Sequence, residues 1–326
     1  MKKIFLLLSI VIFAVCAGCS HNPGPIENPA DKNPSALSDF ECAENEDGSI
    51  TITKYVGAGS SVIIPSNIGD RPVTQIGSCA FQHNDTIVSV EMPDSVTLIE
   101  QKAFEDCTSL SAVSLSRKLK SIAANAFMDC SNLSIITLPD SLTVIKGQAF
   151  LNCTALKHIN IPKNITHLGR SSFQNSGIET IDFEDGIEVI GECAFLCTNI
   201  KTVTLPKSVR KIEYAAFGSC AQLESVVLNE GIITLESRAF GGKSKLTEII
   251  IPSSVIDMDE TFCDYNNSLK TVKFEGDAPE NYRTETTEAF IAPLKEYGYT
   301  NYTVYYHEGA TGFTSPEWCG YPTEIW

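Results

Sequence analysis

The stretch Ile99-Glu-Gln-Lys-Ala-Phe104-Glu-Asp-Cys107-Thr-Ser-Leu110 recurs in close copies along almost the whole chain of 326 residues. Its phenylalanine returns every 22 or 23 residues, at Phe81, Phe104, Phe127, Phe150, Phe173, Phe195, Phe217, Phe240 and Phe262. A fixed period of this length is typical of solenoids, in which each repeat forms one coil and lies on its neighbours. The repeat therefore indicates one elongated unit rather than the two ordinary domains that length alone would suggest.

Each copy has further apolar positions around the phenylalanine. An aliphatic residue stands five residues before it, as Ile99 does before Phe104, and an alternating apolar pair follows it, such as Val113 and Leu115. Short alternating runs rich in branched residues predict strands. Proline often comes directly after the pair, as Pro139 does, and because proline has no backbone N–H it ends the strand pairing and starts a turn.

The expected fold is a leucine-rich-repeat solenoid, dominated by strands, with about nine coils of 22 to 23 residues and a cap at each end. Stacked coils lie about 4.8 Å apart, so the phenylalanines should form a ladder in the interior. We expect a single helical or 3₁₀ turn at each Ala-Phe step.

The two ends of such a solenoid need caps, because a terminal coil would otherwise expose an apolar face and an unpaired strand edge. Residues 40–75 are expected to form an N-terminal β cap, which includes the alternating run Ser49–Tyr55. The repeats are assigned to residues 76–275 and a C-terminal β cap module to residues 276–326. There the β-branched and aromatic run Tyr302–Tyr306 would pair with the last coil.

Five of the twelve cysteines are expected at one position of the repeat. The expected members are Cys107, Cys130, Cys153 and Cys220, three residues after phenylalanine, and Cys197, two residues after it in a short copy, with Ser176 in the same position of the Phe173 copy. A small polar side chain here would satisfy backbone groups in a buried turn, so we expect a ladder of buried thiols. The spacing of adjacent coils would also permit disulfides, so the geometry alone does not exclude them.

The N-terminus has the features of an export signal. Met1–Lys3 precedes an apolar run from Ile4 to Val15, which is shorter than the roughly 20 residues of a membrane-spanning helix. Ala17-Gly18-Cys19 resembles the bacterial lipobox, in which the cysteine carries the lipid, although Cys16 stands where that motif usually has an aliphatic residue. We expect a lipoprotein signal peptide over residues 1–19 with lipidation at Cys19, or an ordinary secreted signal cut nearby.

Residues 20–39 are polar, contain four prolines and show no apolar period, which predicts a tether. The chain is therefore expected to be exported and lipid-anchored, at the bacterial outer membrane or cell surface. Its contact with the membrane would be through this anchor only.

Charge and motifs argue against several classes of function. A net charge of −16 without a Lys/Arg cluster disfavours nucleic-acid binding. The chain has no Gly-x-Ser-x-Gly, phosphate-binding loop or His-Glu-x-x-His motif, and Cys193-Ala-Phe-Leu-Cys197 lacks the second pair that a zinc site needs. We therefore expect no enzyme, no cofactor and no metal.

The motif of an aliphatic residue, four residues ending in Ala, then Phe, then Cys or Asn and Leu resembles the BspA-type leucine-rich repeats of bacterial cell surfaces. The segment Val304–Pro322 looks like the closing module of that family, and the resemblance covers about residues 41–326. It implies a surface-exposed binding protein, with host matrix proteins such as fibronectin as plausible partners.

Ligand specificity should lie where the copies differ, on the outward positions of the predicted strands. The candidate residues are Ile135, Thr137, His158, Asn160, Thr180, Asp182, Thr202, Thr204, Val227 and Ile250. Ile135, Val227 and Ile250 are apolar where the alternation predicts solvent, which fits a bound partner or simply the preference of strands for branched residues. Two functions remain open: an adhesion protein that holds a protein or glycan, and an envelope scaffold or assembly module with no host ligand.

Overall fold

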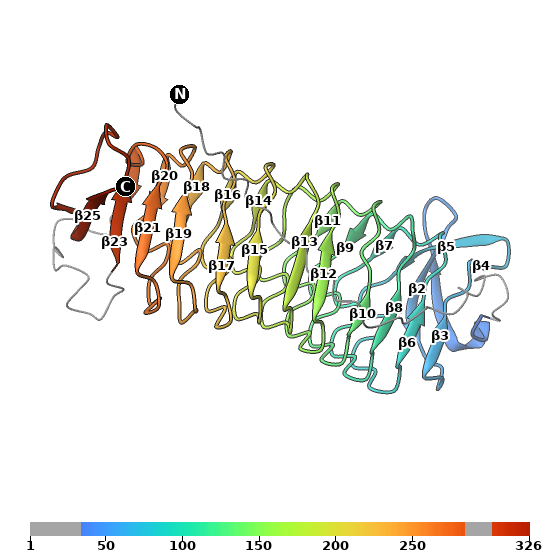
Figure 1. Ribbon diagram of the computed structural model, residues 1–326. Helices are drawn as coiled ribbons and strands as arrows, with labels where there is room; N and C mark the ends of the chain where they lie inside the picture. Colours follow the sequence, from blue (N-terminus) through green and yellow to red (C-terminus); the bar gives the residue numbers. More distant parts are fainter. Residues whose placement is uncertain (1–33, 284–301) are drawn as a thin grey trace, which may run out of the picture. The chain divides into compact units, whose positions relative to one another are not determined.

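The computed structural model describes residues 34–283 and 302–326, which Figure 1 draws in colour. The expected signal peptide, the lipidation site Cys19 and most of the tether lie outside the described residues, as does part of the expected C-terminal cap. Within these ranges no helix is long and apolar enough to cross a bilayer. The one helix in them is the 3₁₀ helix η2 (Leu37–Asp39), so this part of the chain is built from strands and turns.

The strands are short because each coil must turn again after a few residues. In chain order they are β1 (Phe40–Glu44), β2 (Ile50–Tyr55), β3 (Ser61–Ile63), β4 (Asn67–Ile68), β5 (Arg71–Ile76), β6 (Ser89–Glu91), β7 (Leu98–Ile99), β8 (Ala112–Ser114), β9 (Ser121–Ile122), β10 (Ile135–Ile136), β11 (Val144–Ile145), β12 (His158–Ile161), β13 (Thr180–Phe183), β14 (Val189–Ile190), β15 (Thr202–Thr204), β16 (Lys211–Ile212), β17 (Ser225–Val227), β18 (Thr234–Leu235), β19 (Glu248–Ile251), β20 (Asp257–Asp259), β21 (Thr271–Phe274), β22 (Asn281–Arg283), β23 (Thr303–Tyr306), β24 (Glu317–Trp318) and β25 (Tyr321–Ile325). The expected strands around the apolar pairs are therefore present.

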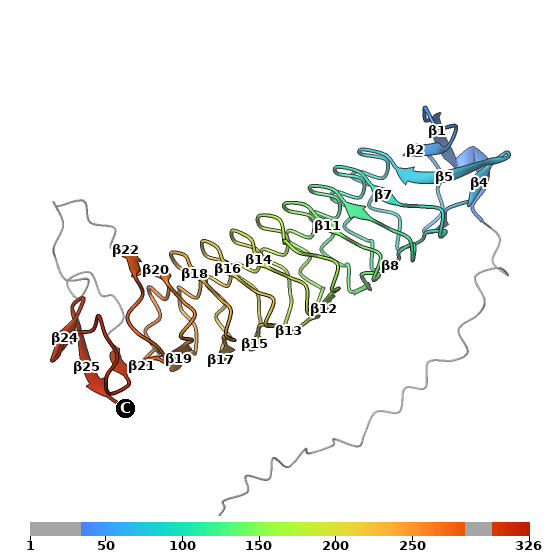
Figure 2. The ribbon, with the colours of Figure 1, turned by 90° about the horizontal axis from the view of Figure 1, so that it is seen from above.

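Two parallel ladders of strands line the two sides of the solenoid, as Figure 2 shows from above. The first ladder runs β2-β5-β7-β9-β11, continues through isolated bridges at Leu168 and His167, and resumes as β14-β16-β18-β20-β22. The second runs from β3 to β25 and is interrupted in its strand pairing after β10, β13 and β17. Its outward surface, which carries the predicted ligand residues, is called the sheet face below.

The first ladder has eleven levels, two more than the nine coils expected from the phenylalanines. The two additional levels are β2 and β22, which pair in parallel with β5 and β20. Segments expected as caps thus stack as further coils. Within the described residues, antiparallel pairs occur only toward the two ends, where β1 pairs with β2, β4 with β5 and β24 with β25.

The nine repeat phenylalanines are all buried and form the expected column in the interior. From Phe81 to Phe240, successive rings stack with centroids 4.7 to 5.5 Å apart. Tyr55 extends the column into the N-terminal cap, since its ring lies 5.2 Å from Phe81 and 5.6 Å from Phe40. The core is therefore continuous from the cap into the repeats.

The Ala-Phe step is not the helical or 3₁₀ turn that we expected. Lys102 and Asp106, two residues before and after Phe104, have positive φ angles of 60° and 57°. This alternation turns the backbone N–H groups of all three residues toward the next coil, where they donate to carbonyl oxygens at 3.1, 2.8 and 2.8 Å. A helix would keep such bonds within its own turn, whereas here they hold neighbouring coils together.

The expected ladder of thiols is confirmed at Cys107, Cys130, Cys153 and Cys220. Each side chain is buried and donates to the backbone carbonyl of the phenylalanine in the preceding coil, at 3.0 to 3.3 Å. All four thiols are free, as are the other cysteines of the described residues. The position therefore satisfies a buried carbonyl in each turn.

Cys197 was wrongly assigned to this ladder. It is exposed with a φ of 59°, while Thr198 is buried and donates through Oγ1 to the carbonyl of Phe195 at 2.9 Å. The residue that occupies the ladder position is therefore the third after phenylalanine, even in this short coil. Ser176 is also the third residue after its phenylalanine, and its hydroxyl donates to the Phe173 carbonyl at 2.7 Å.

Candidate functional site

The sheet face exposes nearly every residue that the sequence placed there. Thr137, His158, Thr180, Asp182, Thr202 and Thr204 are exposed and Asn160 is half-buried. The exposed fractions of the three apolar candidates are 66% for Ile135, 45% for Val227 and 37% for Ile250. The strand alternation that predicted these outward positions is thus confirmed, while their role in binding stays a prediction.

Four of the candidates form one polar patch on adjacent strands. β12 and β13 place His158 opposite Thr180 and Asn160 opposite Asp182. The imidazole Nδ1 of His158 lies 2.9 Å from the hydroxyl of Thr180, and its Nε2 lies 3.7 Å from a carboxylate oxygen of Asp182. This patch offers donors and acceptors to a polar ligand.

The apolar candidates do not form a single patch. Ile135 lies on β10, opposite Ala112, and is separated from Val227 by β12, β13 and β15. Val227 lies on β17, opposite Thr204, and Ile250 lies on the next strand, β19. The sheet face therefore carries apolar residues on both sides of a polar middle, as the sequence suggested.

Charged and aromatic side chains lie at the C-terminal end of the sheet face. Lys273, opposite Ile250, lies with its ammonium 2.7 Å from Glu248 and 5.1 Å from the centre of the Trp326 ring. Trp326 also stacks with His307, with ring centroids 4.5 Å apart. A ligand on β17 and β19 would thus meet an amphipathic border.

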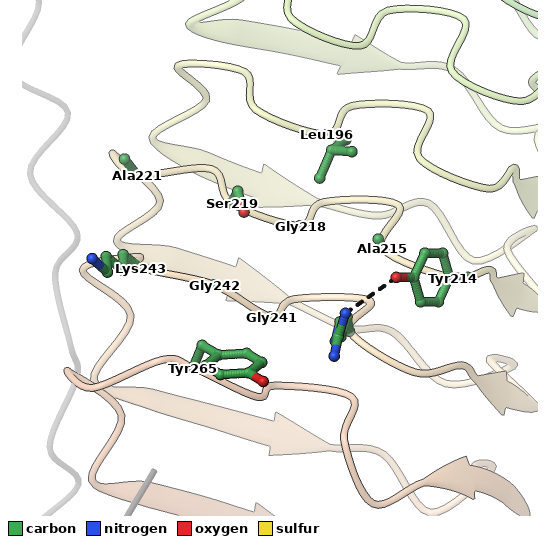
Figure 3. Close-up of a pocket in the computed structure, with 11 residues that line it drawn as sticks. Leu196, Tyr214, Ala215, Gly218, Ser219, Ala221, Gly241, Gly242, Lys243 and Tyr265 are labelled. Atoms are coloured by element: carbon green, nitrogen blue, oxygen red, sulfur yellow. Dashed lines mark hydrogen bonds between the residues drawn. The ribbon is translucent and has the colours of Figure 1, made fainter. Parts of the chain in front are cut away.

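A second candidate site lies at the phenylalanine turns and was missed by the sequence reasoning. It is a hollow of about 470 Å³ between the turns of Phe195, Phe217, Phe240 and Phe262, called the turn pocket below. Figure 3 shows Leu196, Tyr214 and Tyr265 around its edge and three glycines at its centre. Its volume lies within the range of about 300 to 1,000 Å³ that is usual for ligand pockets.

The turn pocket exists because two consecutive turns lack a side chain. The residue after phenylalanine is large in the six preceding turns, namely Gln82, Glu105, Met128, Leu151, Gln174 and Leu196. In the next two turns it is Gly218 and then Gly241, followed by Gly242. This change in the repeat was the signal that could have revealed the pocket.

Arg238 is held at the pocket by two tyrosines. Its Nη1 donates to the hydroxyl of Tyr214 at 3.3 Å, and its guanidinium carbon lies 5.4 Å from the centre of the Tyr265 ring. Partial burial opposes the charged form of Arg238, but the Tyr214 hydroxyl and the negative charge of Asp264 leave its pKa above the usual value. The guanidinium is therefore charged and fixed in orientation.

A second hollow adjoins the first ladder, beside β11. Its wall includes Gly147 and Gly169, which lie backbone to backbone in adjacent coils. A Cβ on Gly169 would stand 2.5 Å from the backbone nitrogen of Gly147, so glycine here serves close packing of the coils. The remaining wall has few convergent polar groups, and we assign it no chemistry.

Neither site holds a recognisable catalytic arrangement. Within the ranges that the structure describes, no three His, Cys, Asp or Glu side chains gather closely enough to bind a metal ion. The buried thiols are poor nucleophiles, because burial raises the pKa of Cys220 to about 11 and that of Cys153 further. The geometry suits binding rather than covalent chemistry.

Comparison with protein families gives one match. The model of the BspA type leucine-rich repeat region matches residues 74–196 and 169–290, with six copies. A search of curated proteins finds no match.

Several solved structures share the fold. A leucine-rich repeat protein from Bacteroides ovatus is 22% identical, with a TM-score of 0.69 over 89% of this chain and 76% of its own. A leucine-rich cell surface protein from Faecalibacterium prausnitzii is 23% identical, with a TM-score of 0.58 over 90% of this chain and 95% of its own. The T. pallidum leucine-rich repeat protein is 28% identical, with a TM-score of 0.50 over 63% of this chain and 85% of its own.

Proposed function

Since this chain belongs to the BspA-type leucine-rich-repeat family, we propose that it is a cell-surface binding or adhesion protein. Its sheet face would hold a protein or glycan ligand, and a host matrix protein is one candidate. The repeat supplies a rigid surface, and the residues that vary from coil to coil supply the specificity.

The observation that carries this proposal is the exposure of branched apolar side chains on the sheet face. Ile135 has an exposed fraction of 66%. The equivalent positions in the coils before and after it hold Ala112, which is small, and His158, which is polar. Val227 and Ile250 repeat the feature on two consecutive strands. Exposed apolar residues next to polar donors and acceptors are typical of protein interaction surfaces.

The location proposed for the protein follows from its N-terminus and its relatives. Lipidation at Cys19, followed by the proline-rich residues 20–39, would anchor the solenoid to the bacterial outer membrane and hold it away from the bilayer. The related F. prausnitzii structure is described as a cell surface protein, which supports an outward orientation. The acidic charge of −16 disfavours any anionic polymer as the ligand.

A second function, that of an envelope scaffold or assembly module, is favoured by the C-terminal end. β24 pairs only with Tyr321 and Pro322, so it covers just the first part of the terminal strand β25. Beyond it, Ile325 and Trp326 have exposed fractions of 60% and 44%. A partly open strand edge with exposed apolar residues could pair with another chain.

The decisive experiment for the adhesion function changes three residues of the sheet face. In the full-length protein on cells, Ile135, Val227 and Ile250 are each replaced by lysine, and adherence to host cells and to matrix-coated surfaces is measured. Lysine places a charge on each apolar contact, so adherence should fall while the circular dichroism spectrum and melting temperature stay unchanged. Unaltered adherence of a folded, surface-exposed variant would refute this binding face.

The first ladder provides a matched control. Val144 on β11, and Ile233 and Ile256 directly before β18 and β20, have exposed fractions of 38%, 41% and 43%, so replacing them by lysine makes the same three substitutions, two of isoleucine and one of valine, on the other side of the solenoid. This control should leave adherence as it was. Protease added to intact cells separates the two functions, since removal of the solenoid requires it to face outward, whereas a periplasmic scaffold would be protected.

A further inference from the structure

The turn pocket has the composition of a binding site in its own right. Its centre is backbone and Cβ only, because Gly218, Gly241 and Ala215 stand where a ligand could approach closely. Tyr214 and Tyr265, with exposed fractions of 37% and 42%, present their rings at its edge. Half-exposed tyrosines around a small-residue floor offer flat apolar surfaces with polar tips.

The charge of Arg238 is not neutralised by direct pairing. No carboxylate of the described residues lies within ion-pair distance of its guanidinium, although Asp264 acts on it from farther away. By contrast, Arg170 at an earlier phenylalanine turn lies 3.3 Å from Glu192. Arg238 donates one hydrogen bond, to Tyr214, which leaves most of its five N–H groups for a ligand.

The neighbouring cation strengthens the preference for an anion. Lys243 also lines the pocket and, unlike Lys245, which pairs with Glu224, forms no ion pair within the described chain. Arg238 and Lys243 thus place two positive charges, neither of them paired with a carboxylate of the described residues, at one pocket. The net charge of −16 would repel a long polyanion, so the preferred ligand carries a single, isolated negative group.

We propose that the turn pocket binds the acidic sugar residue of a glycan, such as a uronic or sialic acid. The planar guanidinium of Arg238 would accept the carboxylate in a two-point hydrogen bond, with Lys243 nearby. The C–H face of the sugar ring would lie against a tyrosine ring, and its hydroxyls would reach the polar rim. This site is separate from the sheet face, so it does not depend on adhesion through Ile135, Val227 and Ile250.

The test uses saturation-transfer NMR and titration of the full-length protein with N-acetylneuraminic acid and with glucuronic acid. Glucose serves as the neutral sugar, and an acidic dipeptide tests a carboxylate outside a sugar. Either acidic sugar, or both, should show transfer. Glucose and the dipeptide should show none, because the pocket needs both the carboxylate and the sugar face.

Two variants probe the pocket itself. Arg238→Gln should weaken binding at least about tenfold, since it removes a charge-assisted hydrogen bond. Gly218→Leu should abolish it by restoring the side chain that Leu196 has one turn earlier. Arg170→Gln, which removes an arginine of the same row of turns, is the matched control and should bind as the parent protein does, as should the triple lysine variant of the sheet face.

The assignment is overturned by any of three results with folded variants, as judged by their melting temperature. These are the absence of transfer to both acidic sugars, binding unaltered by Arg238→Gln and Gly218→Leu, or transfer to the dipeptide or glucose equal to that of the acidic sugars. Each result leaves the adhesion experiment unaffected, so the two proposals fail independently.

Discussion

The six turns from Phe81 to Phe195 differ from the next two, those of Phe217 and Phe240, in a single feature of the repeat. The earlier turns follow phenylalanine with a large side chain, whereas the later ones follow it with Gly218 and Gly241. The interior is unchanged, since the rings of Phe217 and Phe240 still stack 5.5 Å apart. Repeated residues therefore build the coil, and departures from the repeat shape its surface.

The same division separates the inside of a strand from its outside. Ile136 is buried on β10 and is matched by an apolar residue in every other coil, whereas the adjacent Ile135 is exposed and has His158 in the next coil. Stability and the proposed recognition thus reside in neighbouring residues of one strand. Substitutions should affect one property or the other.

The largest effect is expected in the phenylalanine column. Phe150→Ala should lower the free energy of unfolding by about 3 to 5 kcal/mol, because coils fixed above and below cannot collapse into the cavity. Ser219→Ala, in the exposed rim of the turn pocket, should change it by less than about 0.5 kcal/mol. Guanidinium denaturation measures both values. Similar losses of stability in the two variants would contradict the view that stability depends on the repeated positions and not on those that differ from coil to coil.

The thiol ladder should make the solenoid sensitive to alkali. The thiol of an unfolded cysteine has a pKa of about 8.5, whereas burial raises the pKa of Cys220 to about 11. The protonated thiol thus favours the folded state, and its contribution of about 3 kcal/mol is complete below pH 8.5 and is lost as the pH rises toward 11.

Cys220→Ser isolates this contribution, because serine already occupies the equivalent position at Ser176. The variant should lose less stability than the parent protein between pH 8 and pH 10.5 in denaturant titrations. If both proteins lose the same stability over this range, Cys220 does not ionise differently in the folded and unfolded states.

Two glycines sharpen the comparison between packing and recognition. Gly169→Ala should cost about 1 to 3 kcal/mol, because its Cβ would stand 2.5 Å from the backbone of the adjacent coil. Thermal unfolding should show a clear fall in melting temperature. A melting temperature equal to that of the parent protein would mean that the coils can separate here without cost.

Of the two glycines, Gly218 is expected to have the smaller effect on stability. In Gly218→Leu the nearest atom to a new Cβ is the terminal Cδ1 of Leu196, at 3.0 Å, and that side chain can move; the Cβ and the carbonyl oxygen of Ala215 lie at 3.1 Å, a tight contact but without the 2.5 Å overlap found at Gly169. The change should alter the free energy of unfolding by about 1 kcal/mol or less while it fills the turn pocket. A loss as large as that of Gly169→Ala would show that this glycine also serves packing.

Much of the fold could be predicted from sequence, because each core position is repeated nine times. The phenylalanine column, the strands and the thiol ladder all follow from the period. The prediction of a helical turn was wrong, because the identity of a residue such as Lys102 does not indicate a positive φ. That φ is imposed by the backbone hydrogen bonds to the next coil. Cys197 was misplaced because the short coil allows two ways of counting.

The surface was less predictable. Alternation placed the exposed residues of the sheet face correctly, but the turn pocket depends on residues from four coils that meet only in space. Arg238 and Tyr265 are 27 residues apart in sequence, and their contact reflects the stacking of successive turns. Departures from a repeat, such as Gly218, are the feature of the sequence that marks such places.

We propose that recognition lies in those residues of the sheet face that differ from coil to coil, and stability in the repeated interior. The most direct test compares adherence of cells that carry the Ile135, Val227 and Ile250 to lysine variant with cells that carry the first-ladder control of Val144, Ile233 and Ile256. We predict equal melting temperatures and surface amounts, with adherence lost in the first variant and kept in the control. Equal adherence of the two variants would contradict the claim.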